Sequence, residues 1–391
     1  MSEPFQEQLR ALRARSLHRK LREIGSAQGP EVQIVGRQLI NFSSDDYLGL
    51  AADPILRQAA IAAIEEFGVG AGSSRLISGT QSPHAALESA LARWKRAPAA
   101  ICFSSGYAAA VGALPALASK EDVIILDKLC HASLIDGARL SGATLRVFPH
   151  NHLGKLESHL EWARREYPAG RIVIVTEAVF SIDGDRAPLR ELVELKKRFQ
   201  AFLLLDEAHA IGVLGPHGRG LAAELGLESE IDAALGTLGK SLGTSGGYIC
   251  GSRDLIDWLI NRARAFIFST APPPALAVGA TAAIRFLLSE EGETRRKTLW
   301  KRIVQLRKLL PENKEEFGRP GAAIIPWLVG DEQRALDLAR ALRTEGFFVP
   351  TIRYPTVAKG AARLRITVSA AHSALQIASL GDAVRRIGGH S

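Results

Sequence analysis

The sequence predicts an α/β protein whose central sheet is mostly parallel and buried between layers of helices. From about residue 54 to 280, short apolar runs alternate with helical patterns, which is the order that parallel strands and their crossover helices produce. Runs such as VIILD and IVIV are apolar at every position, as expected where both faces of a strand are covered. The 391 residues allow a large core, equivalent to two or three domains at roughly 150 residues each.

The chain begins with a charged segment and a hairpin, which we assign to residues 1–50. Residues 4–25 are expected to form a basic amphipathic helix, because leucines recur near helical spacing. The next stretch, VQIV-GRQ-LINFSS, has the pattern of two strands around a glycine turn. This segment is charged throughout its first part, so neither a secretory signal nor a membrane anchor is expected.

Residues 51–284 are expected to form the large α/β domain with a seven-stranded sheet. Its predicted strands are AAICFS, VIILD, TLRVFP, RIVIVTE, AFLLLDEAH, AALGTLG and GGYICG. Only KSLGTS separates the last two runs, which is too short for a parallel crossover. GGYICG is therefore expected to enter the sheet antiparallel.

Residues 285–391 are expected to form a smaller C-terminal α+β domain, joined to the first by a long helix. The helical patterns around and within it are PALAVGATAAIRFLL, ETRRKTLWKRIVQLRKLL and DEQRALDLARALRTEG. They are mixed with two strand patterns, AAIIPWLV and ARLRITVS. Such mixing of helices with few strands is typical of an α+β unit.

Composition excludes several classes of protein. Hydrophobic residues at 47% and charged residues at 23% match a soluble globular protein rather than a disordered, collagen-like or disulfide-stapled one. Two long uncharged runs, 97–119 and 265–284, contain prolines and polar groups that lipid would leave unsatisfied, so no membrane span is expected. The net charge of +8 suits an anionic partner. Three separated cysteines indicate reduced thiols and a cytoplasmic location: Cys102, Cys130 and Cys250.

Several motifs of other enzyme classes fail in their context. LLLDEAH resembles the acidic strand of nucleotide hydrolases, but GTLGKS has Ala234 where a phosphate loop needs glycine, and a strand follows it. GTSGG also precedes a strand, whereas a nucleophile elbow needs a helix there. GVGAG lacks the third glycine of a dinucleotide fingerprint, and no H-E-x-x-H or C-x-x-C zinc motif occurs. Neither a nucleic-acid partner nor a metal is therefore expected.

Residues at successive strand ends favour pyridoxal 5′-phosphate instead. Asp206 ends one strand, Lys240 lies in a glycine-flanked turn after the next, and the run 105–107 links the first strand to a helix. Ligands of open α/β sheets bind beyond the carboxyl ends of the strands. A lysine can form a Schiff base, a carboxylate can hold a ring nitrogen protonated, and a helix N-terminus can bind a phosphate. Each residue alone could be a surface charge or a helix cap, but the combination favours the cofactor.

Nine motifs, which follow one another along the chain, strengthen this interpretation. They are NFSSDDYLGL, GAGSSRLISGT, SSGYAAA, DKLCHASLIDGA, TEAVFSIDGDRAPL, LLLDEAHAIGVLGPHGRG, TLGKSLG, FSTAPPPA and PTVAKGAARLRITVSAAH. Over nearly its whole length the chain resembles the α-oxoamine synthases. These are fold-type I pyridoxal-phosphate transferases, aspartate aminotransferase-like in fold, that join an amino acid to an acyl thioester with loss of carbon dioxide.

The resemblance implies roles for the residues around the cofactor ring. Lys240 would bind the cofactor covalently and later act as the general base, and Asp206 would pair with the ring nitrogen. His131 would stack on the ring and polarise the acyl oxygen. His209 and Ser181 would hydrogen-bond the phenolic oxygen.

The resemblance also implies how the phosphate is bound. Thr237 and the backbone of Gly106 and Tyr107 would contact it, helped by Ser269 or Thr270 of a second subunit. A homodimer with a shared active site is therefore the expected state.

Substrate contacts are implied in the same way. Arg365 would clamp the amino-acid carboxylate, for which a guanidinium fork is well shaped, whereas Arg363 is expected to be structural. The stretch 352–357 most resembles members that condense L-alanine with a pimeloyl thioester, carried by coenzyme A or an acyl carrier protein. Thr356 and Arg22 would contact that acyl substrate.

Two positions keep other members of the family open. Glu207 stands where many of these synthases have a second Asp, and Tyr354 replaces a proline. Both variants also suit relatives that use glycine with acetyl coenzyme A, and relatives that use serine.

Overall fold

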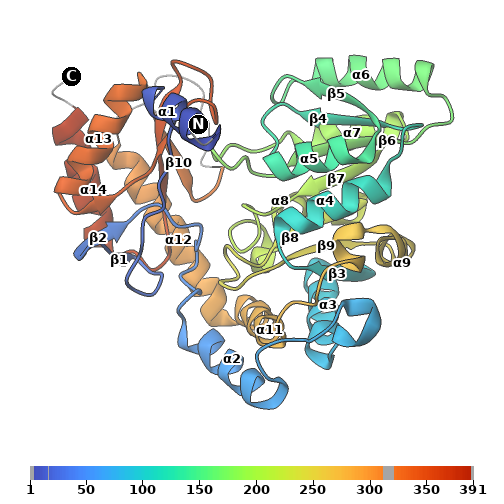
Figure 1. The fold of residues 1–391 in the computed structure, drawn as a ribbon, viewed down its shortest axis with the longest axis horizontal. Helices are drawn as coiled ribbons and strands as arrows, with labels where there is room; N and C mark the ends of the chain where they lie inside the picture. Colours follow the sequence, from blue (N-terminus) through green and yellow to red (C-terminus); the bar gives the residue numbers. More distant parts are fainter. Residues whose placement is uncertain (1–3, 16, 311–320, 389–391) are drawn as a thin grey trace.

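The protein is described from a computed structural model that covers residues 4–15, 17–310 and 321–388. The predicted terminal segments therefore include some positions outside the described residues, namely 1–3, 16, 311–320 and 389–391. Figure 1 shows a large unit built around the central sheet and a smaller unit made from the C-terminal part and the N-terminal hairpin.

The large unit contains all seven strands that the sequence predicts. They are β3 (Ala99–Phe103), β4 (Val123–Asp127), β5 (Thr144–Phe148), β6 (Ile172–Glu177), β7 (Phe202–Asp206), β8 (Ala233–Thr237) and β9 (Gly247–Gly251). Their order in the sheet is β3-β9-β8-β7-β6-β4-β5. Pairs among β4 to β8 are parallel, whereas β9 is antiparallel to both β3 and β8. The predicted antiparallel entry of GGYICG is thus confirmed.

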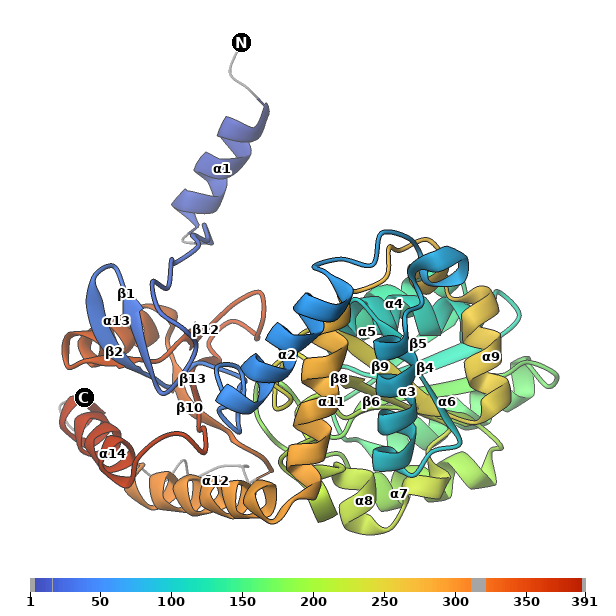
Figure 2. The same cartoon turned by 90° about the horizontal axis from the view of Figure 1, so that it is seen from below.

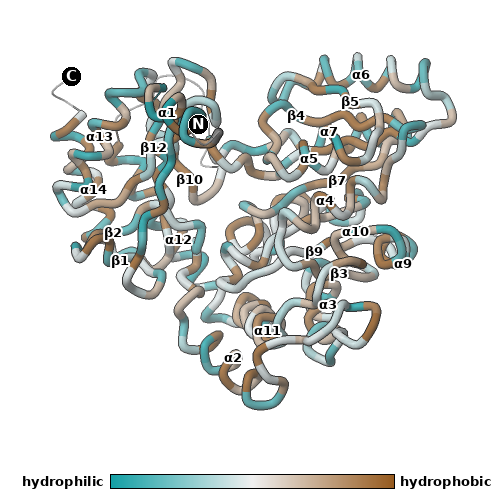
Figure 3. Tube along the Cα trace, viewed as in Figure 1, coloured by the Kyte–Doolittle hydropathy of each residue, from teal (hydrophilic) through white to brown (hydrophobic). Residues whose placement is uncertain are grey.

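Alternate side chains of these strands enter two apolar cores, one on each face of the sheet. In β4, Val123 and Ile125 join one core, and Ile124 and Leu126 join the other. Figure 3 shows the apolar stretches gathered in the strands and in buried helices, with polar residues along outer helices such as α6 (Leu153–Glu166). This burial of both faces explains why the strand sequences are apolar at every position.

Helices cover both faces of the sheet. One core includes side chains of α4 (Gly106–Leu117), α5 (Ala132–Ser141), α9 (Arg253–Arg262) and α10 (Arg264–Ile267). The other includes side chains of α3 (Ser82–Lys95), α6, α7 (Leu189–Arg198), α8 (Leu221–Leu225) and α11 (Pro274–Leu288). A further helix, α2 (Pro54–Phe67), packs on α11.

The small unit has a sheet in the order β10-β13-β12. It comprises β10 (Ile324–Gly330), β12 (Thr351–Ile352) and β13 (Ala362–Thr367), with helices α12 (Glu290–Leu309), α13 (Glu332–Thr344) and α14 (Ala374–Gly388). The predicted strands AAIIPWLV and ARLRITVS are β10 and β13. Helix α14 and the short β12 were not predicted.

The N-terminal hairpin belongs to this unit as well. Strands β1 (Glu31–Ile34) and β2 (Arg37–Asn41) are antiparallel, as predicted, around a two-residue turn at Val35 and Gly36. Both turn residues have positive φ, 50° and 73°, which matches the twist of a tight hairpin. β2 then pairs in parallel with β11 (Phe347–Phe348), so the hairpin extends a sheet of the C-terminal part.

The helix predicted over residues 4–25 is wrong beyond Ala14, where α1 (Pro4–Ala14) ends. Figure 2 shows α1 standing away from both units. Its apolar side chains are uncovered, with Phe5 71% exposed, and Leu21 beyond it is fully exposed. Because helices gain most of their stability from packing of an apolar face, leucine spacing alone does not extend this one.

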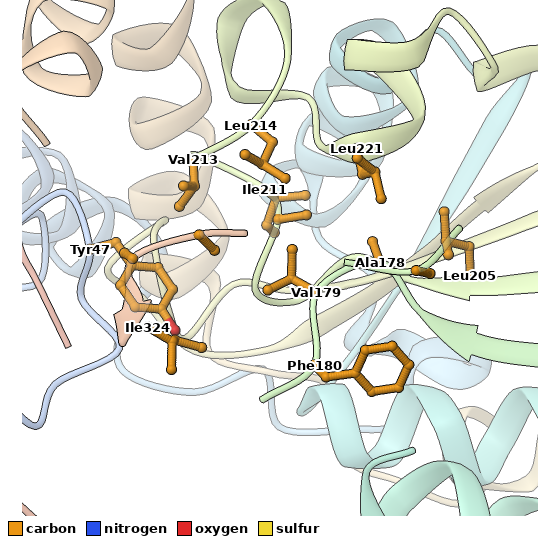
Figure 4. Packing of buried hydrophobic residues seen from close by; sticks show 14 of the residues in the cluster. Tyr47, Ala178, Val179, Phe180, Leu205, Ile211, Val213, Leu214, Leu221 and Ile324 are labelled. Atoms are coloured by element: carbon orange, nitrogen blue, oxygen red, sulfur yellow. The ribbon is translucent and has the colours of Figure 1, made fainter. Parts of the chain in front are cut away.

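The two units share one continuous apolar core. Tyr47, which follows β2, lies beside Ile324 of β10 and near Val179 and Phe180, which follow β6 (Figure 4). This packing brings the small unit against the edge where the parallel strands end. Within the described residues, no helix is both long and apolar enough to cross a membrane.

Candidate active site

Polar side chains meet where β6, β7 and β8 end. Asp206 is the last residue of β7, and its register partner on β6 is Glu177, also a last residue. Thr237 ends β8, and Lys240 lies in the turn that follows. Carboxyl ends of neighbouring parallel strands meet at one edge of a sheet, so the topology itself gathers these groups.

A chain of hydrogen bonds runs outward from Lys240. Its Nζ lies 2.9 Å from Nε2 of His209, and Nδ1 of His209 lies 2.6 Å from the hydroxyl of Tyr47. Burial, followed by the charge of Lys240, lowers the pKa of His209 well below its usual value, so its ring is neutral. Nε2 then accepts from Lys240, and the Nδ1–H donates to Tyr47. The Tyr47 hydroxyl in turn donates to Oδ1 of Asp45 at 3.2 Å.

Asp206 is a buried carboxylate, 6% exposed. Its Oδ1 accepts the Ala208 N–H at 2.8 Å, and its Oδ2 accepts no hydrogen bond from any described residue. Burial raises the pKa of Asp206, and the charge of Lys240 opposes that shift. Burial and then the charge of Asp206 raise the pKa of Glu177 well above its usual value. The adjacent carboxyl groups of Asp206 and Glu177 therefore compete for the positive charge of Lys240.

His131 caps the N-terminus of α5 with its ring exposed. Its Nδ1 lies 2.8 Å from the hydroxyl of Ser133, and its backbone N–H donates to Oε1 of Glu177 at 2.6 Å. Partial burial lowers the pKa of His131, although the charge of Asp206 acts in the opposite direction. A neutral ring is thus fixed in place beside the Asp206 carboxylate.

The N-terminus of α4 lies against the end of β8. Ser105 caps this helix by accepting the Ala108 N–H at 3.0 Å, whereas the N–H groups of Gly106 and Tyr107 have no acceptor among the described residues. A Cβ on Gly106 would lie 3.3 Å from Cβ of Thr237, so glycine permits this close approach. Two unpaired N–H groups at the start of a helix, next to a hydroxyl, form an anion site.

Two arginines of β13 lie on the same face of the strand, and each is paired with an aspartate. Arg365, 8% exposed, donates from Nε to the Ser181 carbonyl at 2.6 Å and from Nη2 to Oδ1 of Asp45 at 3.0 Å. Arg363 pairs with Asp183. Both arginines are therefore engaged by carboxylates of the chain itself.

The two residues expected to contact the acyl substrate line the same cavity. Arg22 and Thr356 both line a cavity of about 800 Å³ between the N-terminal segment and the loop after β12. Thr270 lies elsewhere: it forms a β-bridge with Ser74, and its carbonyl accepts a hydrogen bond from the Ser269 hydroxyl at 3.3 Å.

These residues fit pyridoxal 5′-phosphate. Asp206 offers Oδ2 for a protonated ring nitrogen, Lys240 offers an amine, and the start of α4 offers donors for a phosphate. The exposed ring of His131 lies near these groups, because the charges of Asp206 and Lys240 both act on its pKa. Each element of the cofactor thus meets a group of suitable chemistry.

Sequence reasoning missed three residues of this site: Asp45, Tyr47 and Glu177. Glu177 could have been found, because it ends the strand before Asp206 just as Asp206 ends its own. Asp45 and Tyr47 lie in the quoted motif NFSSDDYLGL, but only the fold shows that this motif reaches Arg365 and His209.

Comparisons with known proteins identify the family of this chain. The family model for aminotransferase class I and II matches residues 37–384. The 8-amino-7-oxononanoate synthase of Pelobacter propionicus is 46% identical over 388 residues, 99% of this chain and 98% of its own.

Solved structures of two related enzymes have the same fold as this chain. A lysine-to-alanine variant of serine palmitoyltransferase from S. paucimobilis, with a bound PLP–myriocin aldimine, has a TM-score of 0.91 and 30% identity, covering 99% of this chain and 97% of that one. The 8-amino-7-oxononanoate synthase from Francisella tularensis has a TM-score of 0.75 and 28% identity, covering 90% of this chain and 98% of that one. The chain therefore belongs to the aminotransferase class I and II family and, within it, to the α-oxoamine synthases with their pyridoxal-phosphate cofactor.

Proposed function

We propose that this enzyme condenses L-alanine with a pimeloyl thioester to give 8-amino-7-oxononanoate, carbon dioxide and the free thiol, a step of biotin biosynthesis. The observation that carries the proposal is the convergence of Lys240, His209 and Asp206 near Arg365, a buried cation that can hold a carboxylate. The choice of substrates is supported by 46% identity over the whole chain with the Pelobacter 8-amino-7-oxononanoate synthase, against 30% with serine palmitoyltransferase.

Pyridoxal phosphate, when bound, supplies a covalent attachment for the substrate amino group and an electron sink for charge that develops at the α-carbon. Asp206 would hold the proton on the ring nitrogen, because its negative charge favours the protonated state. Gly106, Tyr107 and Thr237 would bind the phosphate, and His209 with Ser181 would orient the phenolic oxygen.

The chain's own groups can then carry the proton transfers. The Lys240 amine would take the α-proton of the amino acid and return one at the end of the reaction. The Nε2 atom of neutral His209, 2.9 Å away, can accept a hydrogen bond from that amine without placing a second positive charge beside it. His131 would polarise the carbonyl oxygen of the thioester, and Arg365 would hold the amino-acid carboxylate in a fixed orientation.

The cavity between Arg22 and Thr356 is the proposed acyl site. Its lining contains several basic side chains, which would suit the phosphate groups of coenzyme A or of an acyl carrier protein; they are His18, Arg19, Lys20, Arg22 and Arg353.

We also propose a homodimer in the cytoplasm, in which Thr270 of the partner subunit completes the phosphate site. Ile77 and Phe268, which flank the bridge between Ser74 and Thr270, are 80% and 70% exposed. Large apolar side chains gathered around one bridge are typical of an interface. The three cysteines are buried free thiols, as suits a reducing compartment.

One assay separates this function from its relatives: thiol release with pimeloyl and acetyl thioesters, each paired with alanine, glycine and serine. We expect the highest kcat/KM for alanine with the pimeloyl thioester, and weaker use of glycine, since one methyl group gives only about 10- to 200-fold discrimination. Faster turnover of glycine with acetyl coenzyme A would contradict the proposal. Preference for serine would favour the second candidate, a serine-using synthase, which the TM-score of 0.91 to serine palmitoyltransferase supports.

A further inference from the structure

The proposed carboxylate clamp already holds a carboxylate of the protein itself. Asp45, in the segment after β2, lies 3.0 Å from Nη2 of Arg365, and the Arg365 Nε is bonded to the Ser181 carbonyl. One edge of the guanidinium fork is thus fully used within the chain.

We propose that Asp45 competes with the carboxylate of the amino-acid substrate for Arg365 and so sets the affinity for that substrate. The inference rests on the proposed role of Arg365 as the clamp. A substrate carboxylate can take the place of Asp45, or it can bind the other edge of the fork beside Asp45. In the first case an ion pair must break, and in the second two negative charges share one cation, so both cases weaken binding.

Asp45 is suited to such an exchange. Arg365 is nearly fully buried, but the Asp45 side chain is 34% exposed and can turn towards water. Its hydrogen bond from Tyr47, at 3.2 Å, is longer than the 2.6 Å contact between Tyr47 and His209. Release of Asp45 therefore leaves Tyr47 held by His209.

The competition persists at every working pH. Burial would raise the pKa of Asp45, but the charge of Arg365, its hydrogen bond to Asp45 and the charge of Lys240 outweigh burial and lower the pKa to about 2. The carboxylate is consequently charged whenever the enzyme is active, and only a substitution can remove the competitor.

The neighbouring pair of Arg363 and Asp183 provides a matched control. It has the same chemistry, two residues away on the same strand, but we assign it no substrate contact. An Asp183→Asn variant should therefore leave amino-acid binding within about twofold of wild type, the scatter expected for a substitution that removes no substrate contact.

The experiment compares cofactor-loaded wild type with Asp45→Asn, Asp45→Ser and Asp183→Asn. Calorimetry measures the Kd of L-alanine and of L-alaninamide, which lacks the carboxylate, and initial rates give the KM of each substrate. Both Asp45 variants should bind L-alanine about fivefold more tightly, as expected when one partly exposed competing charge is lost. Binding of L-alaninamide and the KM of the thioester should not change.

Unchanged or weaker L-alanine binding in both folded Asp45 variants would overturn the inference. An equal gain for L-alaninamide would do so too, because the effect would then not depend on the carboxylate. An Arg365→Ala variant tests the proposed clamp separately: if it binds L-alanine as well as wild type does, the clamp assignment fails whatever the Asp45 variants show.

Discussion

Glu207 provides a quantitative test of how this active-site edge is supported. It follows Asp206 directly, but its side chain enters the core, where Oε2 lies 2.5 Å from Nζ of Lys95 and Oε1 accepts the Ala222 N–H at 3.1 Å. Lys95 and Glu207 are only 6% and 1% exposed. Glu207→Gln keeps the shape and the acceptor for Ala222 but leaves a buried ammonium without its counter-ion.

Breaking such a pair by removing one partner costs about 3–5 kcal/mol. At about 2 °C per kcal/mol for a large chain, the thermal midpoint should fall by roughly 6–10 °C. Circular dichroism at a fixed protein and cofactor concentration measures this midpoint for Glu207→Gln, Lys95→Met and the double variant. The double variant should lose much less than the sum of the single losses, because neither charge is then left alone. Additive losses, or a fall of less than 2 °C for Glu207→Gln, would refute the reasoning.

Two further outcomes are expected. Asp206→Asn should keep the thermal midpoint within a few degrees but lower kcat by a factor of about 100 or more, as for loss of a preorganised electrostatic group; near wild-type kcat with full cofactor would contradict its role. His150 lies 3.0 Å from Asp127 and 2.8 Å from Asp185, and although partial burial opposes them, these carboxylates raise its pKa from 6.5 to about 10. The folded state therefore prefers the charged ring, so this stabilisation is complete below pH 6.5 and is lost as pH rises towards 10. The thermal midpoint of wild type should fall over that range more steeply than that of His150→Gln, and parallel curves would exclude the effect.

Much of the large unit could be predicted because its strands carry an unambiguous signal. Burial on both faces forces apolar residues at every position, as in β4 and β6, and the short link before β9 determines its direction. The sequence patterns were less informative where tertiary packing determines the secondary structure. Leucine spacing overestimated the length of α1, which lacks a surface to pack on. The two-residue strands β11 and β12 are too short to show a periodicity.

The site shows the same division. Lys240 and Asp206 could be identified because each follows a strand of one sheet, whose topology brings their positions together. The pairing of Arg365 with Asp45 joins residues 320 positions apart, and no local pattern encodes it. The presence of Glu rather than Asp at position 207 is explained only by the fold, in which the Glu207 side chain contacts Lys95.

The parallel pairing of β2 with β11 also orders events during synthesis of the chain. The ribosome releases the hairpin among the first residues, but its partner strand, at Phe347 and Phe348, emerges only after the whole central sheet has been made. Domains fold largely as they emerge, so a nascent chain can assemble the edge around Lys240 while the hairpin still lacks its third strand. Closing this long loop, which brings Asp45 to Arg365, is therefore expected late in the assembly of the enzyme, after the central sheet has formed.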